Sequence, residues 1–335
     1  MKLSYRILLI AFLVFITGIF YWAIFSPKED ISERIQKTLK EQGKRADLTF
    51  KDVSFEEVVA GVKYWKLTAK DAMVNKSTDI ATLRDSKGTF YKKGEAVLRF
   101  ISPAALWDMK KKEIYMDKPL GYDVKLESKI SSLLRKIKKS NQSIFNLPAL
   151  YKKGPGYWFK AKNCSWKFND QKLLCTGGIV VNKGEVTGYS ENLQADVALE
   201  NIFLKGDPKI IIKPKNSSPI TVEAKIFEVI SSQDIIVARG SPKVFWGSAE
   251  IVSTNIKYLQ RDKLLELSGW AQVKYKDIRA WGKSAKYYSK EQKIVLEGDA
   301  GAVQADNRLS GKKVQVSFKD QKISVLGRGK AVFSD

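Results

Sequence analysis

Residues 294–298 read Ile-Val-Leu-Glu-Gly, and this short pattern decides the fold because it recurs along the second half of the chain. The residues four and two places before the glycine are apolar in every copy, as is the residue four places after it. The steps between successive glycines are 29, 34, 29, 29 and 29 residues, and the glycines are Gly177, Gly206, Gly240, Gly269, Gly298 and Gly327. Alternation of apolar and polar residues with a period of two predicts strands with one apolar face and one solvent-exposed face. The regular spacing of the glycines predicts a stack of repeated units.

Short polar segments precede several of these glycines. They are residues 169–172 (Asn-Asp-Gln-Lys), 290–293 (Lys-Glu-Gln-Lys) and 319–322 (Lys-Asp-Gln-Lys). Each predicts a hairpin with a loop of about four residues, and each glycine then marks a bend or bulge. The one longer step contains an insertion with proline and serine around residues 214–219. We therefore predict an all-β chain of repeated antiparallel hairpins.

The first half carries the same pattern more weakly. The spacing of residues 285–294 recurs at 105–114, and Lys118 then occupies the glycine position, 59 residues before Gly177. Between the halves, residues 127–156 interrupt the series. Their apolar residues have helical spacing within a basic stretch that ends in Gly-Pro-Gly, which predicts a helix and a linker.

The N-terminus predicts a membrane anchor. Residues 7–25 form an almost unbroken apolar run, which as a helix approaches the ~30 Å of a bilayer core. Lys2 and Arg6 precede it, and acidic residues follow Lys28, so the positive-inside rule places the N-terminus in the cytoplasm and residues 27–335 outside. A cleaved signal peptide is the alternative. It would have a shorter apolar region and a small-x-small cleavage site, so we favour a retained anchor.

A short helix is expected directly after the anchor, over residues 30–43. Ile31, Ile35 and Leu39 recur every fourth residue, Asp30 can cap the first turn, and Gly43 can end the helix. Nothing in this segment suggests chemistry.

Composition narrows the function classes. The 335 residues include no histidine and two cysteines, so no histidine-based catalytic pair and no cysteine-rich metal site can be built. We predict no catalytic residue, no cofactor and no metal. The formal net charge of +23 suits an anionic partner, although a solvated basic surface explains it equally well. Location outside the cytoplasm argues against nucleic acid as that partner.

The two cysteines flank one predicted turn. Cys164 and Cys175 lie symmetrically about residues 169–170, so they can oppose each other on one hairpin. Outside the cytoplasm we expect such a pair to oxidise where the geometry permits, as a structural link. The alternative is two small buried thiols that face the interior.

The apolar face of the stack has two explanations. Folding the sheet over itself, as a V-shaped or jelly-roll sandwich, encloses an elongated interior. Side chains can fill this interior as a core. Small residues on the same face, such as Ala238, Ala271, Ala300, Ala302 and Ala331, can instead leave a groove for acyl chains with a basic rim. The candidate contacts for a lipid are Leu173, Val181, Leu204, Ile210, Leu265, Leu267, Val273, Ile294, Leu296, Ile323 and Val325.

Two family resemblances cover nearly all of the chain beyond the anchor. Residues 50–124, with Gly-Val-Lys-Tyr-Trp-Lys-Leu-Thr-Ala at 61–69 and Ala-Leu-Trp-Asp at 105–108, resemble the LptC family of lipopolysaccharide export. Residues 157–335 resemble the OstA/LptA family in the repeated pattern ending in glycine, preceded by Ala-Lys-Tyr at 285–287. The chain departs from both families by joining them, by the 127–156 insertion and by Lys118 at a glycine position.

The resemblances imply the domain order and the function. Residues 1–26 are expected to be the cytoplasmic tip and anchor, 27–47 the juxtamembrane helix, 48–126 an LptC-like β domain, 127–156 the insertion and 157–335 an OstA/LptA-like β-jellyroll. The implied function is an inner-membrane, periplasmic bridge without enzymatic activity. It takes lipopolysaccharide or a related anionic lipid from an inner-membrane ABC transporter, which supplies the energy, since this chain has no phosphate-binding Walker loop.

Two further expectations concern partners and alternatives. The final strand, residues 330–333, can add to the sheet of another β-jellyroll bridge protein. The competing function is a non-catalytic envelope scaffold with a closed β-sandwich core, whose basic surface meets another protein or an acidic polymer.

Overall fold

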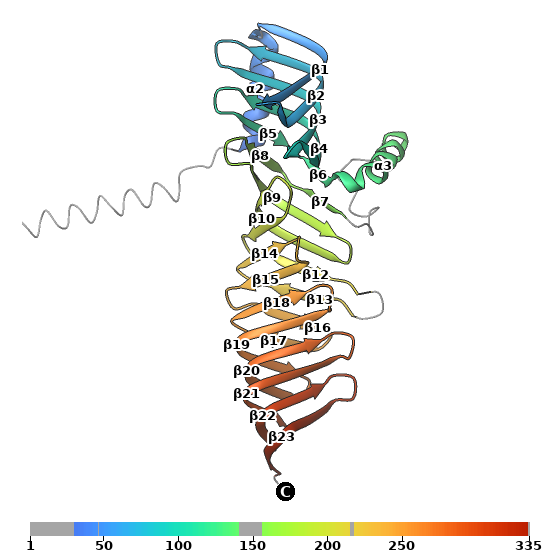
Figure 1. Ribbon diagram of the computed structural model, residues 1–335, viewed down its shortest axis with the longest axis vertical. Helices are drawn as coiled ribbons and strands as arrows, with labels where there is room; N and C mark the ends of the chain where they lie inside the picture. The colour runs from blue at the N-terminus through green and yellow to red at the C-terminus, as the bar shows by residue number, and fades with distance from the viewer. Residues whose placement is uncertain (1–29, 46, 141–155, 215–217, 334–335) are drawn as a thin grey trace, which may run out of the picture.

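The computed structural model describes residues 30–45, 47–140, 156–214 and 218–333, and its strands form one antiparallel sheet of 23 strands (Figure 1). The predicted anchor at residues 7–25 lies outside these residues. Within the described ranges, no helix has both the length and the apolar character needed to cross a bilayer. The fold prediction of repeated antiparallel hairpins is confirmed.

The elements of the first half are the helix α2 (Ile31–Arg45), six strands, a short 3-10 helix η1 (Val124–Leu126) and the helix α3 (Glu127–Ser140). The strands are β1 (Leu48–Val59), β2 (Val62–Asn75), β3 (Ile80–Lys92), β4 (Glu95–Asp108), β5 (Glu113–Asp117) and β6 (Leu120–Asp123).

The second half consists of strands throughout its described residues. They are β7 (Tyr157–Lys160), β8 (Asn163–Lys167), β9 (Lys172–Lys183), β10 (Val186–Asp196), β11 (Asn201–Lys205), β12 (Lys209–Ile212), β13 (Ile220–Glu223), β14 (Ile226–Ile230), β15 (Ile235–Arg239), β16 (Lys243–Trp246), β17 (Ala249–Val252), β18 (Asn255–Leu259), β19 (Leu264–Tyr275), β20 (Ile278–Tyr288), β21 (Lys293–Gln304), β22 (Asn307–Ser317) and β23 (Lys322–Val332). The loops between β8 and β9, β20 and β21, and β22 and β23 lie at the three predicted polar turns.

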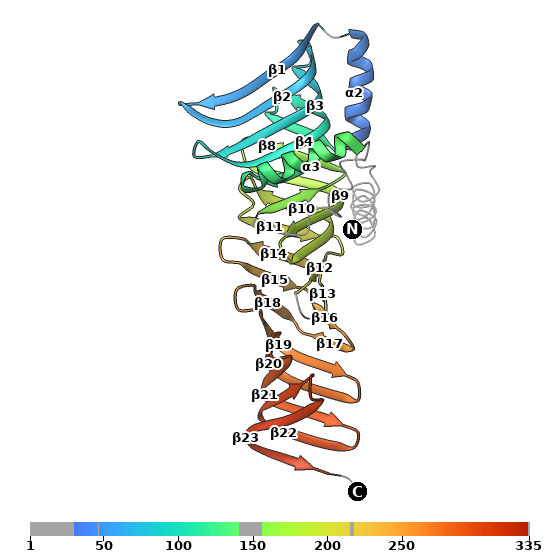
Figure 2. The same ribbon diagram turned by 90° about the vertical axis from the view of Figure 1, so that its right-hand side faces the viewer.

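The sheet is folded along its length into two walls, stacked in one column (Figures 1 and 2). Wall I contains β5, β8, β11, β14, β15 and β18, and wall II contains β6, β7, β12, β13, β16 and β17. The long strands run through both walls. In β10, for example, residues 186–189 pair with β12 of wall II, and residues 192–195 pair with β11 of wall I.

The repeated glycines form the corner where the two walls meet. All six have positive φ, between 73° and 88°, which a residue without a Cβ adopts readily. Steric crowding is a second reason for glycine at some of these positions. At Gly240 (φ +85°), an added Cβ would lie 2.7 Å from the Cβ of Lys225, which passes on the neighbouring chain segment. Gly240 therefore allows both the bend and the close approach of the adjacent corner.

The corner continues into the first half without glycine. Asp52, Asp85 and Lys118 have φ of 49°, 47° and 44°. The structure thus has Lys118 at a corner, where the weak repeat predicted it. Aspartate is among the few residues that tolerate this conformation, so Asp52 and Asp85 take the glycine's place in strands where sequence comparison with the second half shows no repeat.

Both walls continue past the 127–156 insertion. In wall I, β5 pairs with β8 over residues 113–117 and 163–167. In wall II, β6 pairs with β7 over residues 120–122 and 158–160. The insertion therefore leaves the stack between two strands that remain paired, and it does not interrupt the sheet.

The two helices lie outside the walls (Figure 2). Helix α2 covers the helix predicted at 30–43 and begins with the predicted cap, since Ser32 N donates to Asp30 Oδ1 at 3.0 Å. The prediction that Gly43 ends the helix is wrong, because α2 continues to Arg45. Its fully buried Ile35 packs on Ala104 and Leu106, on the outer face of β4. The start of α3 covers the outer face of wall II, where Ile130 packs against β6 and β7.

Candidate functional site

The interior between the walls is one continuous apolar cluster. It extends from Trp65 in β2 to Phe318, directly after β22, and includes residues from both halves of the chain. Nine of the candidate residues are at most 6% exposed within it, namely Leu173, Val181, Leu204, Ile210, Leu265, Leu267, Val273, Ile294 and Leu296. The other two, Ile323 and Val325, are half-buried in the last strand and pack against the same cluster. The structure thus brings all eleven candidates onto one face.

Side chains from the two walls meet and close this interior. A cavity lined by Val181, Leu204 and Ile210 among others measures about 20 Å³. A second cavity, lined by Phe227, Ile256 and Leu265 among others, measures about 10 Å³. Neither is large enough to hold an acyl chain.

The interior also contains polar atoms without partners. Among the described residues, the indole nitrogens of Trp166 and Trp246 and the hydroxyl of Tyr287 are buried and accept or donate no hydrogen bond. Trp246 and Tyr287 lie close together, with ring centroids 5.8 Å apart. Burial raises the pKa of the Tyr287 hydroxyl, so it stays protonated and available as a donor. Sequence reasoning did not single out these residues, because each occupies an ordinary apolar position of the repeat.

Polar contacts bridge the open side of the fold, where the hairpin turns of the two walls face each other. We call this side the mouth. Lys183, at the end of β9 in wall II, contacts Asp234, in a wall I turn, with Nζ and Oδ1 2.6 Å apart. Lys263 of wall I lies 3.7 Å from Glu185 of wall II. Further along, the Tyr275 hydroxyl donates to the carbonyl of Phe318 at 3.0 Å.

Asp234 is the charged centre of the mouth. Its carboxylate accepts hydrogen bonds from Lys183 and from Arg261, whose Nε lies 2.9 Å away. The hydrogen bond from Lys183, followed by that from Arg261, holds the pKa of Asp234 below its ordinary value. Sequence reasoning missed the mouth, because its residues lie in hairpin loops whose pairing depends on how the two walls stack.

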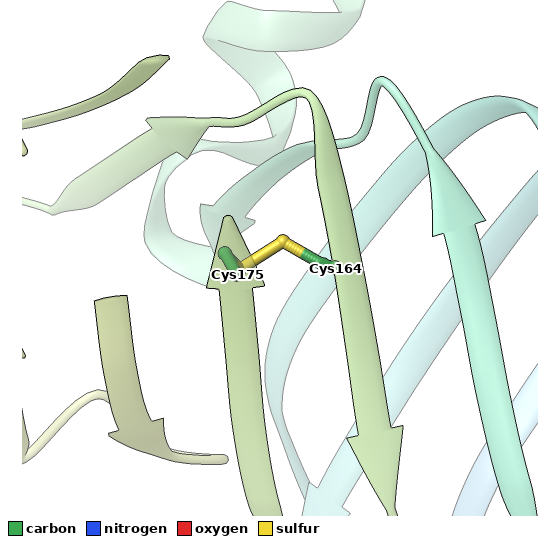
Figure 3. The surroundings of a disulfide bond; sticks show 2 residues. All are labelled: Cys164 and Cys175. Carbon is green, nitrogen blue, oxygen red and sulfur yellow. A yellow bond between two sulfur atoms is a disulfide. The ribbon is translucent and has the colours of Figure 1, made fainter. Parts of the chain in front are cut away.

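Cys164 and Cys175 form a disulfide between β8 and β9 (Figure 3). The two residues are direct cross-strand partners, with Cα atoms 4.0 Å apart. Both are at most 1% exposed and belong to the interior cluster. The bond therefore links the first two strands of wall I that follow the insertion.

Both ends of the sheet are open edges. Within the described residues, β1 pairs only with β2, and β23 pairs only with β22. Apolar side chains are exposed at each end, including Phe50 (40%) at the first and Val332 (48%) at the last. An unpaired edge with exposed apolar residues is a template for the strand of another chain.

Comparison with known proteins finds similarity over the second half. Residues 159–322 match the family described as LptA/(LptD N-terminal domain) LPS transport protein. Among solved structures, a match is LptH from Pseudomonas aeruginosa, described as the LptA homologous periplasmic component of the conserved lipopolysaccharide transport device. It is 22% identical, covers 36% of this chain and 100% of its own, and superimposes with a TM-score of 0.33. No curated protein sequence matches the chain significantly. Residues 159–322 are therefore similar to the LptA/(LptD N-terminal domain) family of lipopolysaccharide transport proteins.

Proposed function

We propose that this protein is a membrane-anchored periplasmic bridge that carries lipopolysaccharide, or a related anionic lipid, between its two walls. The acyl chains lie in the apolar interior, and the phosphorylated sugars project through the mouth. The chain performs no catalysis, and energy comes from an inner-membrane ABC transporter to which its first half connects.

One observation carries this proposal: the apolar interior runs unbroken from β2 to the end of β22, through the junction between the two halves. A scaffold with two independent cores has no reason to align their apolar faces in one register. A conduit requires this alignment, because an acyl chain that meets a polar break must be exposed to water.

The unpartnered polar atoms favour a conduit over a closed scaffold core. Each buried donor without a partner costs roughly 1–3 kcal/mol, so a core selected only for stability replaces it with an apolar group. In a conduit, the donors of Trp166, Trp246 and Tyr287 have a role, because the ester and hydroxyl oxygens of a lipid can accept their hydrogen bonds.

The mouth provides the route of entry. Its contacts are ion pairs and single hydrogen bonds between loops, which exchange with water at modest cost, whereas each wall is held by a continuous ladder. We expect the walls to separate at the mouth and to remain joined at the glycine corner.

The remaining parts of the proposal concern the first half and the partners. The resemblance of residues 50–124 to LptC and the apolar run at 7–25 support attachment to the inner membrane, with the bulk of the chain in the periplasm. The open edges at β1 and β23 suit strand addition by other β-jellyroll proteins, at the transporter end and at the distal end.

A photo-crosslinker placed on the two faces of one strand tests the function. Leu267 faces the interior and is 3% exposed, whereas its neighbour Glu266 lies on the outer face, where it pairs with Lys286. In cells, we expect lipid adducts from a crosslinker at Leu267 and none above background at Glu266. Equal adducts at both positions, or none at either, would contradict the proposal.

A further inference from the structure

A cavity also lies outside the walls. It measures about 440 Å³ and opens on the outer face of wall II and its continuation, next to the corner. Six of its lining residues carry the argument, namely Glu250, Trp270, Gln272, Lys274, Arg279 and Trp281. These six lie outside the interior cluster, whereas two further lining residues, Val273 and Ala280, belong to it. The proposed lipid path therefore does not account for this cavity.

Trp270 occupies a position that the repeat assigns to small residues. The residue after each corner glycine has positive φ in five units, and it is Gly178, Asp207, Ser241 or Asp299 in four of them. In the fifth unit it is Trp270, with φ 64° and a side chain that is 47% exposed. A bulky residue with this backbone conformation is strained, and burial of the ring does not offset the strain.

On the same face, the side chain of Trp281 occupies space that a glycine on the neighbouring strand leaves free. Its cross-strand neighbour is Gly301, and a Cβ at Gly301 would lie 2.5 Å from Trp281 Cζ2, so only glycine lets the indole lie against the wall. The guanidinium of Arg308 lies 5.6 Å from the ring centroid, which is a cation–π contact. The Trp281 indole is thus in contact with both Gly301 and Arg308, whereas the Trp270 indole stands exposed at the corner.

The cavity also presents two cations, Lys274 and Arg279, and one carboxylate, Glu250, which is the cross-strand neighbour of Lys274. Lys274 and Arg279 are direct cross-strand neighbours, both exposed, and neither forms an ion pair with another described residue. Beside them, the amide of Gln272 and the carboxylate of Glu250 can donate to and accept from hydroxyl groups.

We propose that this outer cavity binds a negatively charged sugar, of one or two residues carrying phosphate or carboxylate. The exposed Trp270 indole stacks on the C–H face of a sugar ring beside Trp281, the two cations bind the acidic group, and the amide and carboxylate bind hydroxyls. The cavity volume lies within the range of small-ligand sites, whereas a protein partner needs a contact of about 800 Å² on each side. The site is separate from the interior path, and its sugar is either the head group of the carried lipid or a free saccharide.

Saturation-transfer NMR on the full chain in detergent tests the site, with glucose 1-phosphate as the probe. We expect transfer to the ring protons of the probe, and binding about tenfold weaker for glucose or for inorganic phosphate alone, because each lacks half of the contacts. Trp270→Asp removes the indole and restores the residue type of Asp207 and Asp299. Arg279→Gln removes one cation, and both variants should lower affinity for the probe at least severalfold.

Arg328→Gln, at an exposed corner position in the last strand, is the matched control and should bind the probe as the parent does. Absence of transfer in the parent, or equal transfer in Trp270→Asp and Arg279→Gln, overturns the proposal. So does stronger competition by tetraglutamate than by the sugar phosphate, because the surface would then suit an acidic peptide.

Two further readouts separate this site from the interior. If purified lipopolysaccharide competes with glucose 1-phosphate, the cavity binds the head group of the lipid. If it does not compete, the cavity binds a separate saccharide. Either result supports a sugar site. The lipid adduct at Leu267 should persist in both cavity variants. Failure of the conduit would remove that adduct from the parent chain and leave sugar-phosphate binding intact.

Discussion

At the scale of single residues, the corner glycines combine two constraints that can be separated. Gly240 and Gly327 have nearly the same backbone conformation, with φ of 85° and 88°. At Gly240 an added Cβ meets the Cβ of Lys225 at 2.7 Å, whereas at Gly327 nothing lies within 4 Å. The first therefore carries a conformational and a steric constraint, and the second carries only the conformational one.

We expect Gly327→Ala to lower the free energy of unfolding by about 1 kcal/mol, which is the cost of the left-handed conformation for a residue with a Cβ. Gly240→Ala should lower it by about 1–3 kcal/mol more, because the adjacent corner must also move. Chemical denaturation of the two variants measures the difference. Equal losses would show that close approach of the corners does not matter.

The hydroxyl of Tyr287 distinguishes a conduit from a filled core. Because this buried hydroxyl has no partner among the described residues, Tyr287→Phe should raise the stability of the lipid-free protein by about 1 kcal/mol. The same variant should retain less lipid, since it loses a donor to the ligand. Thermal unfolding of delipidated protein and lipid quantification after purification test the two parts. A variant that is more stable and retains all of its lipid would contradict a role of this hydroxyl in binding.

At the scale of elements, α2 is attached to the stack by a small number of contacts. Its hydrophobic contact is centred on Ile35, and the Ser32 hydroxyl lies 2.6 Å from Asp117 Oδ1 at the end of β5. The salt bridge between Asp30 and Lys162 reaches across the junction. The start of the helix thus lies against the point where the two halves meet.

We expect Ile35→Ala to cost about 2–5 kcal/mol of local stability and to release α2 without unfolding the walls. Hydrogen exchange should then increase in residues 31–41 and stay unchanged in β19–β22. Gln36→Ala, on the exposed side of the same helix, is the control and should exchange as the parent does. Increased exchange throughout the walls would mean that α2 is part of the core rather than an attached element.

The loops of the mouth should respond to acid through Asp234. Its pKa is lowered in the folded protein, so its contribution to closure is fully present above the ordinary value of 3.8 and is lost as the pH falls through the lower, folded value. We expect the distance between spin labels at Gln233 and Lys213, on opposite sides of the mouth, to stay constant from pH 7 to about 4 and to increase below pH 4. In Asp234→Asn, the distance between the two labels should be large at every pH. A distance in this variant that still changes with pH would assign the acid response to another group.

At the scale of the whole molecule, the sequence predicts that repeated hairpins stack on one another, but it does not predict how the two walls contact each other. Period-two alternation and the glycine spacing predict the strands, the corners and the buried face, because these depend on neighbours along the chain. The 20 Å³ cavity, the pairing of Lys183 with Asp234 and the cavity at Trp270 depend on the angle between the walls and on the offset between units, which no local pattern encodes. The sequence pattern did not reveal Asp52 and Asp85 as corner residues. Aspartate can adopt the same positive φ as glycine, but it does not match glycine in a search for repeats.

The central claim is that the two walls enclose a lipid path, and native mass spectrometry of the full-length chain purified in mild detergent tests it most directly. The account predicts a stoichiometric anionic glycolipid on the protein. It further predicts that a disulfide across the mouth, from Lys183→Cys and Asp234→Cys, formed after delipidation, prevents the lipid from binding again. Purified protein without bound lipid, or undiminished reloading with the mouth locked, would contradict the claim.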